Sequence, residues 1–241
     1  MSLSVYIGLL IPFFGTALGA AAVFFLKRGS KTIERILLGF AAGVMVAASI
    51  WSLLLPAIER STPLGIFSPL LVSSGLWAGV LFLLLLGRGQ ESGGRLTLAV
   101  VLHNIPEGMA VGVVFAAYLA NETETSLATA MALSIGIGIQ NMPEGAIISL
   151  PAYARGGGRG RAFGSGVLSG VVEPIFAALA IVLASLVGAV LPFLLAFAAG
   201  AMLLVVVEEL LPEAAQAPRH IGAVAFALGF TLMMLLDVLL G

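Results

Sequence analysis

The sequence predicts an all-α integral membrane protein of eight transmembrane helices, in a single domain of residues 1–241 with both termini on the extracellular or periplasmic side. Three observations lead to this fold class. Hydrophobic residues make up 60% of the chain and charged residues only 10%, whereas globular domains are nearer half apolar and a quarter charged. Apolar runs long enough to cross a bilayer follow one another between short polar breaks. The basic residues fall almost entirely in alternate breaks.

The apolar runs define the spans. With about 20 residues per crossing, 241 residues leave room for about eight helices and no separate soluble domain. The first run lacks a basic leader and a cleavage motif, and we interpret it as a retained span rather than a signal peptide. In chain order the predicted spans are 4–26, 33–57, 64–86, 96–119, 127–152, 163–188, 190–213 and 220–240.

Polar breaks delimit these spans. Lys27–Lys31 ends the first span, Gly87–Arg95 follows the third, and Arg155–Arg161 follows the fifth. The break after the fourth span, Asn121–Glu124, carries only acidic charges. Between the sixth and seventh spans, Leu191-Pro192 barely interrupts the apolar run.

The distribution of Lys and Arg predicts the orientation. Ten of the 11 basic residues fall in the loops after the first, third, fifth and seventh spans, and only Arg60 falls on the other side. Cytoplasmic loops are enriched in Lys and Arg, so these loops are expected inside and both termini outside. The ten residues are Lys27, Arg28, Lys31, Arg35, Arg88, Arg95, Arg155, Arg159, Arg161 and Arg219.

Internal repeats indicate an inverted architecture. Segments 40–56 and 197–212 both begin with Phe-Ala-Ala-Gly and end with Leu-Leu-Pro, with a slip of one residue between them. They lie five spans apart, so the two copies are expected to cross the membrane in opposite directions. Two further near-copies in the fourth and fifth spans complete a three-two-three arrangement. Inverted repeats of this kind are a recurrent plan of secondary transporters.

These two near-copies, residues 103–108 and 140–145, carry the polar chemistry of the chain. Carboxylate, imidazole and amide groups at bilayer depth are expensive, so they mark a functional site. Residues three and four apart share a helix face, which aligns His103 with Glu107 and Gln140 with Glu144. Together they predict a cation site in a dry interior. The six side chains are His103, Asn104, Glu107, Gln140, Asn141 and Glu144.

A proline and a glycine flank each glutamate of these phrases. Each proline is expected to kink its helix, because it lacks a backbone donor and displaces a carbonyl. Gly108 and Gly145 permit close helix contact, so we expect the two helices to cross through them and bring Glu107 and Glu144 together. Paired carboxylates repel in low dielectric unless a cation or a proton lies between them.

With these features the chain resembles the ZIP (zinc/iron permease) family of metal transporters, above all its bacterial members. Further matching residues are Glu173-Pro174, Met45 with Ser52, and the run from Glu208 to Glu213. The resemblance implies a multi-pass protein of the cell membrane that takes divalent metal into the cytoplasm by alternating access. It also implies that the first, fourth, fifth and sixth spans move against the others.

The resemblance implies two metal positions. The first matches His103, Glu107, Gln140 and Glu144, with Met45 near it. The second matches Asn104, Glu107, Asn141, Glu144 and Glu173, with the two glutamates bridging. Members with two occupied positions often carry Asp at the place of Asn141, so the neutral amide predicts weak or passing occupancy. Pathway and exit roles are expected for Ser52 and for Glu208 and Glu209.

Ligand type alone does not determine the metal, since these donors suit zinc and also iron, manganese, cobalt or cadmium. An exporter or a channel-like path stays open, because energetics set the direction. An intramembrane metalloenzyme is a rival, since His and Glu at this spacing can hold catalytic zinc. It is disfavoured because the HExxH motif and a separate base are missing, and no enzyme activity or nucleic-acid binding is expected.

The sequence also gives predictions about cofactors, partners and oligomeric state. No resident cofactor is expected, and the partners are the metal substrate and the lipid bilayer. A homodimer is compatible with the glycine-rich face of Gly164, Gly166 and Gly170. Asp237, near the end of the last span, is interpreted as a solvated carboxylate.

Overall fold

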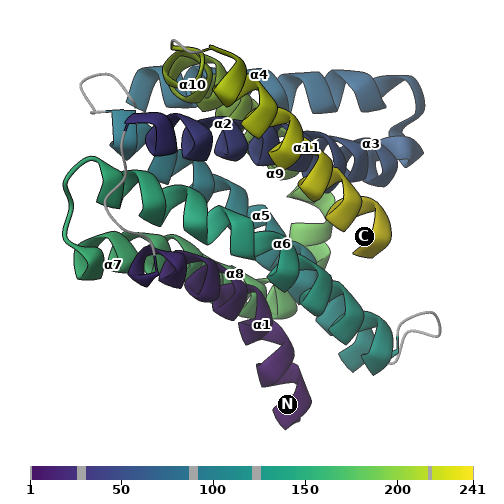
Figure 1. Cartoon of the computed structure of the whole chain (residues 1–241). Coiled ribbons are helices and arrows are strands. Elements are labelled where there is room, and N and C mark those ends of the chain that lie inside the picture. The colour runs from purple at the N-terminus through teal and green to yellow at the C-terminus, as the bar shows by residue number, and fades with distance from the viewer. Residues whose placement is uncertain (1, 26–30, 87–91, 121–125, 217–218, 241) are drawn as a thin grey trace.

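The computed structural model describes residues 2–25, 31–86, 92–120, 126–216 and 219–240, and every regular element in these ranges is helical (Figure 1). The predicted all-α class is therefore confirmed. The α-helices are α1 (Leu3–Ala20), α2 (Lys31–Ala48), α3 (Leu55–Ser61), α4 (Ser68–Leu86), α5 (Ser92–Leu119), α6 (Leu127–Ala154), α7 (Arg159–Gly170), α8 (Val172–Val182), α9 (Ala184–Val205), α10 (Leu211–Ala214) and α11 (Arg219–Leu240). Shorter segments are the 3₁₀ turns η1 (Ala21–Phe24) and η3 (Thr62–Phe67) and the π segments η2 (Ser49–Leu54) and η4 (Val206–Leu210).

Within the described ranges, six helical runs are long and apolar enough to cross a membrane. One of them, Arg35–Leu85, runs from α2 through α3 to α4, and its helical path is broken at Gly65, whose φ is 57°. The buried helix α6 is not among the six, although it has 28 residues. These runs make the chain a multi-pass membrane protein, and the eight crossings stay a prediction. The six runs are Leu3–Phe24, Arg35–Leu85, Leu96–Leu119, Arg159–Val182, Ala184–Ala214 and His220–Leu239.

The boundary between the predicted sixth and seventh spans differs from the prediction. The helix ends at Val182 and the next begins at Ala184, with Leu183 in a non-helical conformation, rather than breaking between 188 and 190. Pro192 lies inside α9 and is buried. A proline is tolerated within a membrane helix where neighbouring groups compensate for the lost hydrogen bond, so it marked no boundary here.

The helices form two layered groups (Figure 1). In the α5–α6 group, α1 packs most extensively on α6 and α5 on α8, with α7 beside α1 and α6. In the α2–α11 group, α2 packs on α11 and α4 on α9, and α3 and α10 continue two of these helices. The groups meet where α5 contacts α9 and α6 contacts α2. Exchanging the first three predicted spans with the last three, and the fourth with the fifth, maps these pairings onto one another, as inverted repeats require.

The repeated segments share a local distortion. In each copy a π segment directly precedes a Leu-Pro pair, Leu55-Pro56 in one and Leu211-Pro212 in the other. The π segment η2 has six residues and η4 has five. Since π turns absorb extra residues within an α-helix, they account for the slip of one residue between the repeats.

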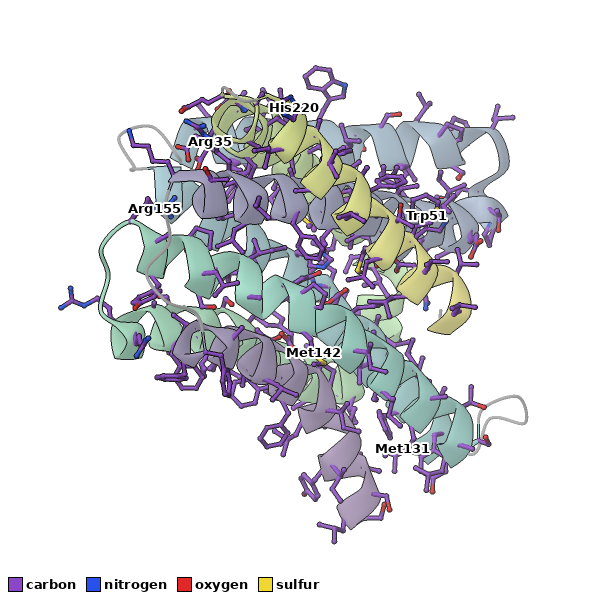
Figure 2. All side chains as sticks on the ribbon, viewed as in Figure 1. Arg35, Trp51, Met131, Met142, Arg155 and His220 are labelled. Carbon is purple, nitrogen blue, oxygen red and sulfur yellow. The ribbon has the colours of Figure 1, made fainter. Side chains whose placement is uncertain are left out.

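The two ends of the bundle differ in charge. Arg35 and Arg155 lie at one end, and Trp51 and Met131 lie toward the other (Figure 2). The described ends of the first and last helices lie near this second end, where α3, which contains Arg60, turns into α4 (Figure 1). Lys27, Arg28, Arg88 and the acidic loop Asn121–Glu124 are outside the described residues. Which end faces the cytoplasm stays a prediction.

The glycines of the two phrases contact other helices than expected. A side chain at Gly145 would overlap the backbone oxygen of Thr16 in α1, and one at Gly108 would overlap that of Glu173 in α8. The predicted crossing of α5 and α6 through these two glycines is therefore wrong. Gly145 instead packs α6 against α1, and Gly108 packs α5 against α8. Helices α5 and α6 contact one another along their polar faces.

Candidate metal site

The polar faces of α5 and α6 bring together three side chains of types that can bind a metal ion. His103 Nε2 lies 3.2 Å from Glu107 Oε1 in the same helix and 2.9 Å from Glu144 Oε1 in α6. One ligand atom from each residue lies within 4.8 Å of the other two. The exposed fractions are 0% for His103, 3% for Glu107 and 1% for Glu144. The carboxylates thus converge as the sequence predicted, around an imidazole that touches both.

Many polar atoms around these three side chains have no hydrogen-bond partner among the described residues. Buried polar atoms in folded proteins are nearly always paired, and an uncompensated buried carboxylate is costly. Unpaired donors and acceptors therefore indicate a place for a cation, a proton or water. The atoms are His103 Nδ1, Asn104 Oδ1, both carboxylate oxygens of Glu107, both amide atoms of Asn141, Glu144 Oε2, Glu173 Oε2 and Asp237 Oδ2.

A cavity of about 380 Å³ leads to the cluster. Its lining includes the exposed residues Glu59 and Arg60 at one end of the bundle and the buried Glu107 at its base. Gln140 and Asp237 line it from the two helix groups. The cavity carries the carboxylates of Glu59, Glu107 and Asp237 on its lining, and it connects Glu107 with the end of the bundle that holds Arg60.

Asp237 is a functional candidate that the sequence interpretation placed wrongly. It is 7% exposed, not solvated, and its Oδ1 accepts hydrogen bonds from Gln140 Nε2 at 2.8 Å and Ser52 Oγ at 2.5 Å. These bonds join α6 to η2 and α11. The signal was available, because Asp237 is the single carboxylate of the last predicted span and buried carboxylates in membranes are expensive.

Asn104, Asn141 and Glu173 lie in the interior beside the cluster. The amide of Asn104 donates from Nδ2 to the backbone oxygen of Ser169 at 3.0 Å, which leaves Oδ1 open. Glu173, fully buried at the start of α8, lies outside the group of three ligands and accepts a hydrogen bond from Thr16 at 2.7 Å. Thr16 is a second residue that the sequence interpretation missed.

The remaining candidates are Met45, Glu208 and Glu209. Met45 is fully buried in the apolar core of α2, where Ser49 donates to its backbone oxygen at 2.7 Å. Glu208 is exposed and Glu209 is buried, both on the π segment η4. A metal role for these three residues stays a prediction.

Comparisons with known proteins identify the family of the chain. The family described as ZIP zinc transporter matches residues 91–237. Zinc transporter ZIP11 of Homo sapiens is 34% identical over 99% of this chain and 98% of its own length. Zinc transporter GufA of Myxococcus xanthus is 34% identical, with 94% of each chain covered. Zinc transporter ZIPB of Bordetella bronchiseptica is 36% identical over 95% of this chain and 79% of its own.

The match covers most of the chain, including all of α5, α6, α8 and α9, and the relatives extend it over nearly the full length. Among the residues that carried the sequence resemblance, the fold buries His103, Glu107 and Glu144 together inside an apolar helical bundle. The chain belongs to the ZIP family of membrane metal transporters.

Proposed function

We propose that the protein takes divalent metal ions, zinc foremost, into the cytoplasm by alternating access. The observation that carries this proposal is the convergence of His103, Glu107 and Glu144 from two helices in the interior of an apolar bundle. Charged groups in such a place are paired or hold a metal.

The first metal position comprises these three residues with Gln140, and Met45 near it. One imidazole and two carboxylates are typical zinc ligands, and a zinc site with three protein ligands keeps a place for water or an exchanging group. The relatives are named zinc transporters, which supports zinc over other metals. Iron, manganese, cobalt and cadmium remain candidates, because ligand type ranks metals without excluding them.

The second position comprises Asn104, Glu107, Asn141, Glu144 and Glu173. Open oxygens of Asn104 and Glu173 beside the cluster support it. Since Asn141 is neutral, this position has one negative charge fewer than it would have with an aspartate at residue 141. It therefore holds metal weakly or only during transport.

Direction and topology follow from the two ends of the bundle. The cavity reaches Glu107 from the end that holds Arg60, and Arg35 and Arg155 lie at the opposite end (Figure 2). By the positive-inside rule the cavity end is outside, so eight spans with outward termini give a metal ion access from outside. Glu208 and Glu209 then lie toward the cytoplasmic exit, and Ser52 lies in the entry path.

Alternating access requires two bodies that shift relative to one another. The ligands come from the α5–α6 group, whereas the opposite wall of the cavity, with Ser52 and Asp237, comes from the α2–α11 group. Moving the first group along the second would close this access and open another toward the cytoplasm. An exporter uses the same parts in reverse, and a channel-like path would leave both ends open at once.

Uptake of zinc by vesicles reconstituted with the purified protein tests the function. Glu144→Gln and His103→Ala are expected to lower the initial rate at least about 100-fold, because each removes a ligand from a shared ion. Ser134→Ala is the matched control, since this buried α6 hydroxyl donates to the backbone oxygen of Ala130 in its own helix, at 3.1 Å. Wild-type rates in both ligand variants would refute the transport site.

The same vesicles distinguish the alternative hypotheses about the metal, the direction of transport and the mechanism. A panel of divalent metals ranks the substrates, and opposite zinc gradients reveal a preferred direction. A flux that saturates with zinc supports alternating access, whereas a linear flux indicates a channel. The homodimer expected from the Gly164 face stays a prediction that the mass of the detergent-solubilised protein would test.

A further inference from the structure

A hydroxyl from α1 reaches the carboxylate of Glu173 across the α5–α6 group. Thr16 Oγ1 donates to Glu173 Oε1 at 2.7 Å, and both side chains are fully buried. The two residues are 157 positions apart in the chain. Thr16 Oγ1 lies 3.4 Å from its other neighbour, the backbone oxygen of Pro12, so the bond to Glu173 is the shorter of the two.

This bond makes the two oxygens of Glu173 unequal. Oε1 is occupied by the hydroxyl, whereas Oε2 is buried and has no hydrogen-bond partner among the described residues. A buried carboxylate oxygen without a partner is costly, so it indicates a place for a cation or a proton. Glu173 therefore offers one oxygen to a ligand and keeps the other for Thr16.

Close backbone packing holds this arrangement in place. A Cβ at Gly170 would lie 2.9 Å from Thr16 Cβ and 3.0 Å from Glu173 Oε1, so the missing side chain makes the room that these two groups fill. The backbone of Thr16 packs closely against Gly145 of α6, and the backbone of Glu173 packs closely against Gly108 of α5. Gly108 directly follows Glu107, and Gly145 directly follows Glu144. Helix α1 is thus tied to the site although it supplies no ligand to the cluster.

We propose that Thr16 is a positioning residue for metal transport, which holds Glu173 through Oε1 so that Oε2 alone is available to the metal. The inference rests on the proposed function and adds to it a residue from α1. A hydrogen bond to a charged group is among the stronger ones in proteins, and its loss leaves Glu173 free to turn away or to bind through both oxygens.

Two substitutions of Thr16 separate positioning from packing. Thr16→Val has nearly the same shape and lacks the hydroxyl, and Thr16→Ser keeps the hydroxyl and lacks the methyl group. For zinc uptake into vesicles we expect Thr16→Val to raise KM about tenfold. Thr16→Ser is expected to stay within about twofold of wild type, because its donor is retained. Thermal melting in detergent is measured beside uptake, and Ser134→Ala controls for loss of a buried hydroxyl elsewhere.

Each outcome decides the question. A raised KM in Thr16→Val with rescue in Thr16→Ser, at similar melting temperatures, supports positioning. Equal KM values in Thr16→Val and wild type overturn it, and so does an equal defect in both Thr16 variants, which indicates packing. Glu144→Gln is run in parallel: if it transports like wild type, the proposed function itself fails, whereas a dead Glu144→Gln with a normal Thr16→Val refutes only the role of Thr16.

Discussion

His103 occupies the centre of the site at the residue scale, since its Nε2 lies within 3.2 Å of carboxylate oxygens of both Glu107 and Glu144. In the proposed site a metal and a proton would compete for these ligand atoms, because metal binding requires a neutral imidazole and ionised carboxylates. The neutral Asn141 would add no charge to this site.

Acidic conditions are expected to weaken zinc uptake through KM. As the pH falls, protons are expected to occupy the ligand atoms in place of zinc. Initial rates at several zinc concentrations and pH values, in vesicles with equal pH on both sides, measure this effect. A KM that stays constant as the medium is acidified would show that these ligands do not bind zinc in exchange for protons.

At the element scale, glycines decide which helices pair. In α6, Gly145 faces the backbone oxygen of Thr16, and in α5, Gly108 faces that of Glu173. Without a hydrophobic driving force between helices in lipid, such close backbone contacts supply much of the packing energy. They also leave the polar faces of α5 and α6 opposite one another, where the ligands meet.

Replacing Gly145 by Ala is expected to destabilise the protein by about 1–3 kcal/mol, because the new methyl group overlaps a backbone atom that cannot turn aside. Gly164→Ala is the matched control, since a Cβ there would meet nothing within 4 Å. Thermal unfolding in detergent, followed by circular dichroism, compares the two variants. Equal melting temperatures would contradict the contact between α1 and α6.

At the scale of the whole molecule, the cavity lies between two helix groups. Glu107 and Gln140 line it from one group, and Ser52 and Asp237 line it from the other. The bond from Gln140 to Asp237 crosses this boundary at 2.8 Å. A sliding motion of one helix group along the other would have to break the hydrogen bond between Gln140 and Asp237. This bond could form again when the groups return.

The orientation of the bundle is tested by labelling, which is clean because the chain has no cysteine. A cysteine at Ser2 is expected to react with an impermeant maleimide from outside intact cells, and one at Gly158, at the opposite end, only after the cells are opened. Both positions are exposed. The reverse pattern would invert the topology and turn the cavity toward the cytoplasm.

Much of the fold and of the candidate site can be predicted from the sequence. Helical class, the polar phrases and the alignment of His103 with Glu107 depend on composition and on neighbours three or four residues apart. The break at Leu183 was misplaced because one residue in a non-helical conformation leaves no polar signal in an apolar run. The burial of Asp237 was missed because α11 packs along α2, which position in the chain does not reveal.

By itself, the sequence determined that the chain crosses a membrane and which side chains are too polar to be there without a use, since both depend on local chemistry. Only the tertiary structure decided that Glu144 meets His103, that Gly145 packs on α1 rather than on α5, and that Thr16 and Asp237 join the polar interior. Those contacts join residues 41 to 157 positions apart. They depend on how whole helices cross, which spacing along one helix does not encode.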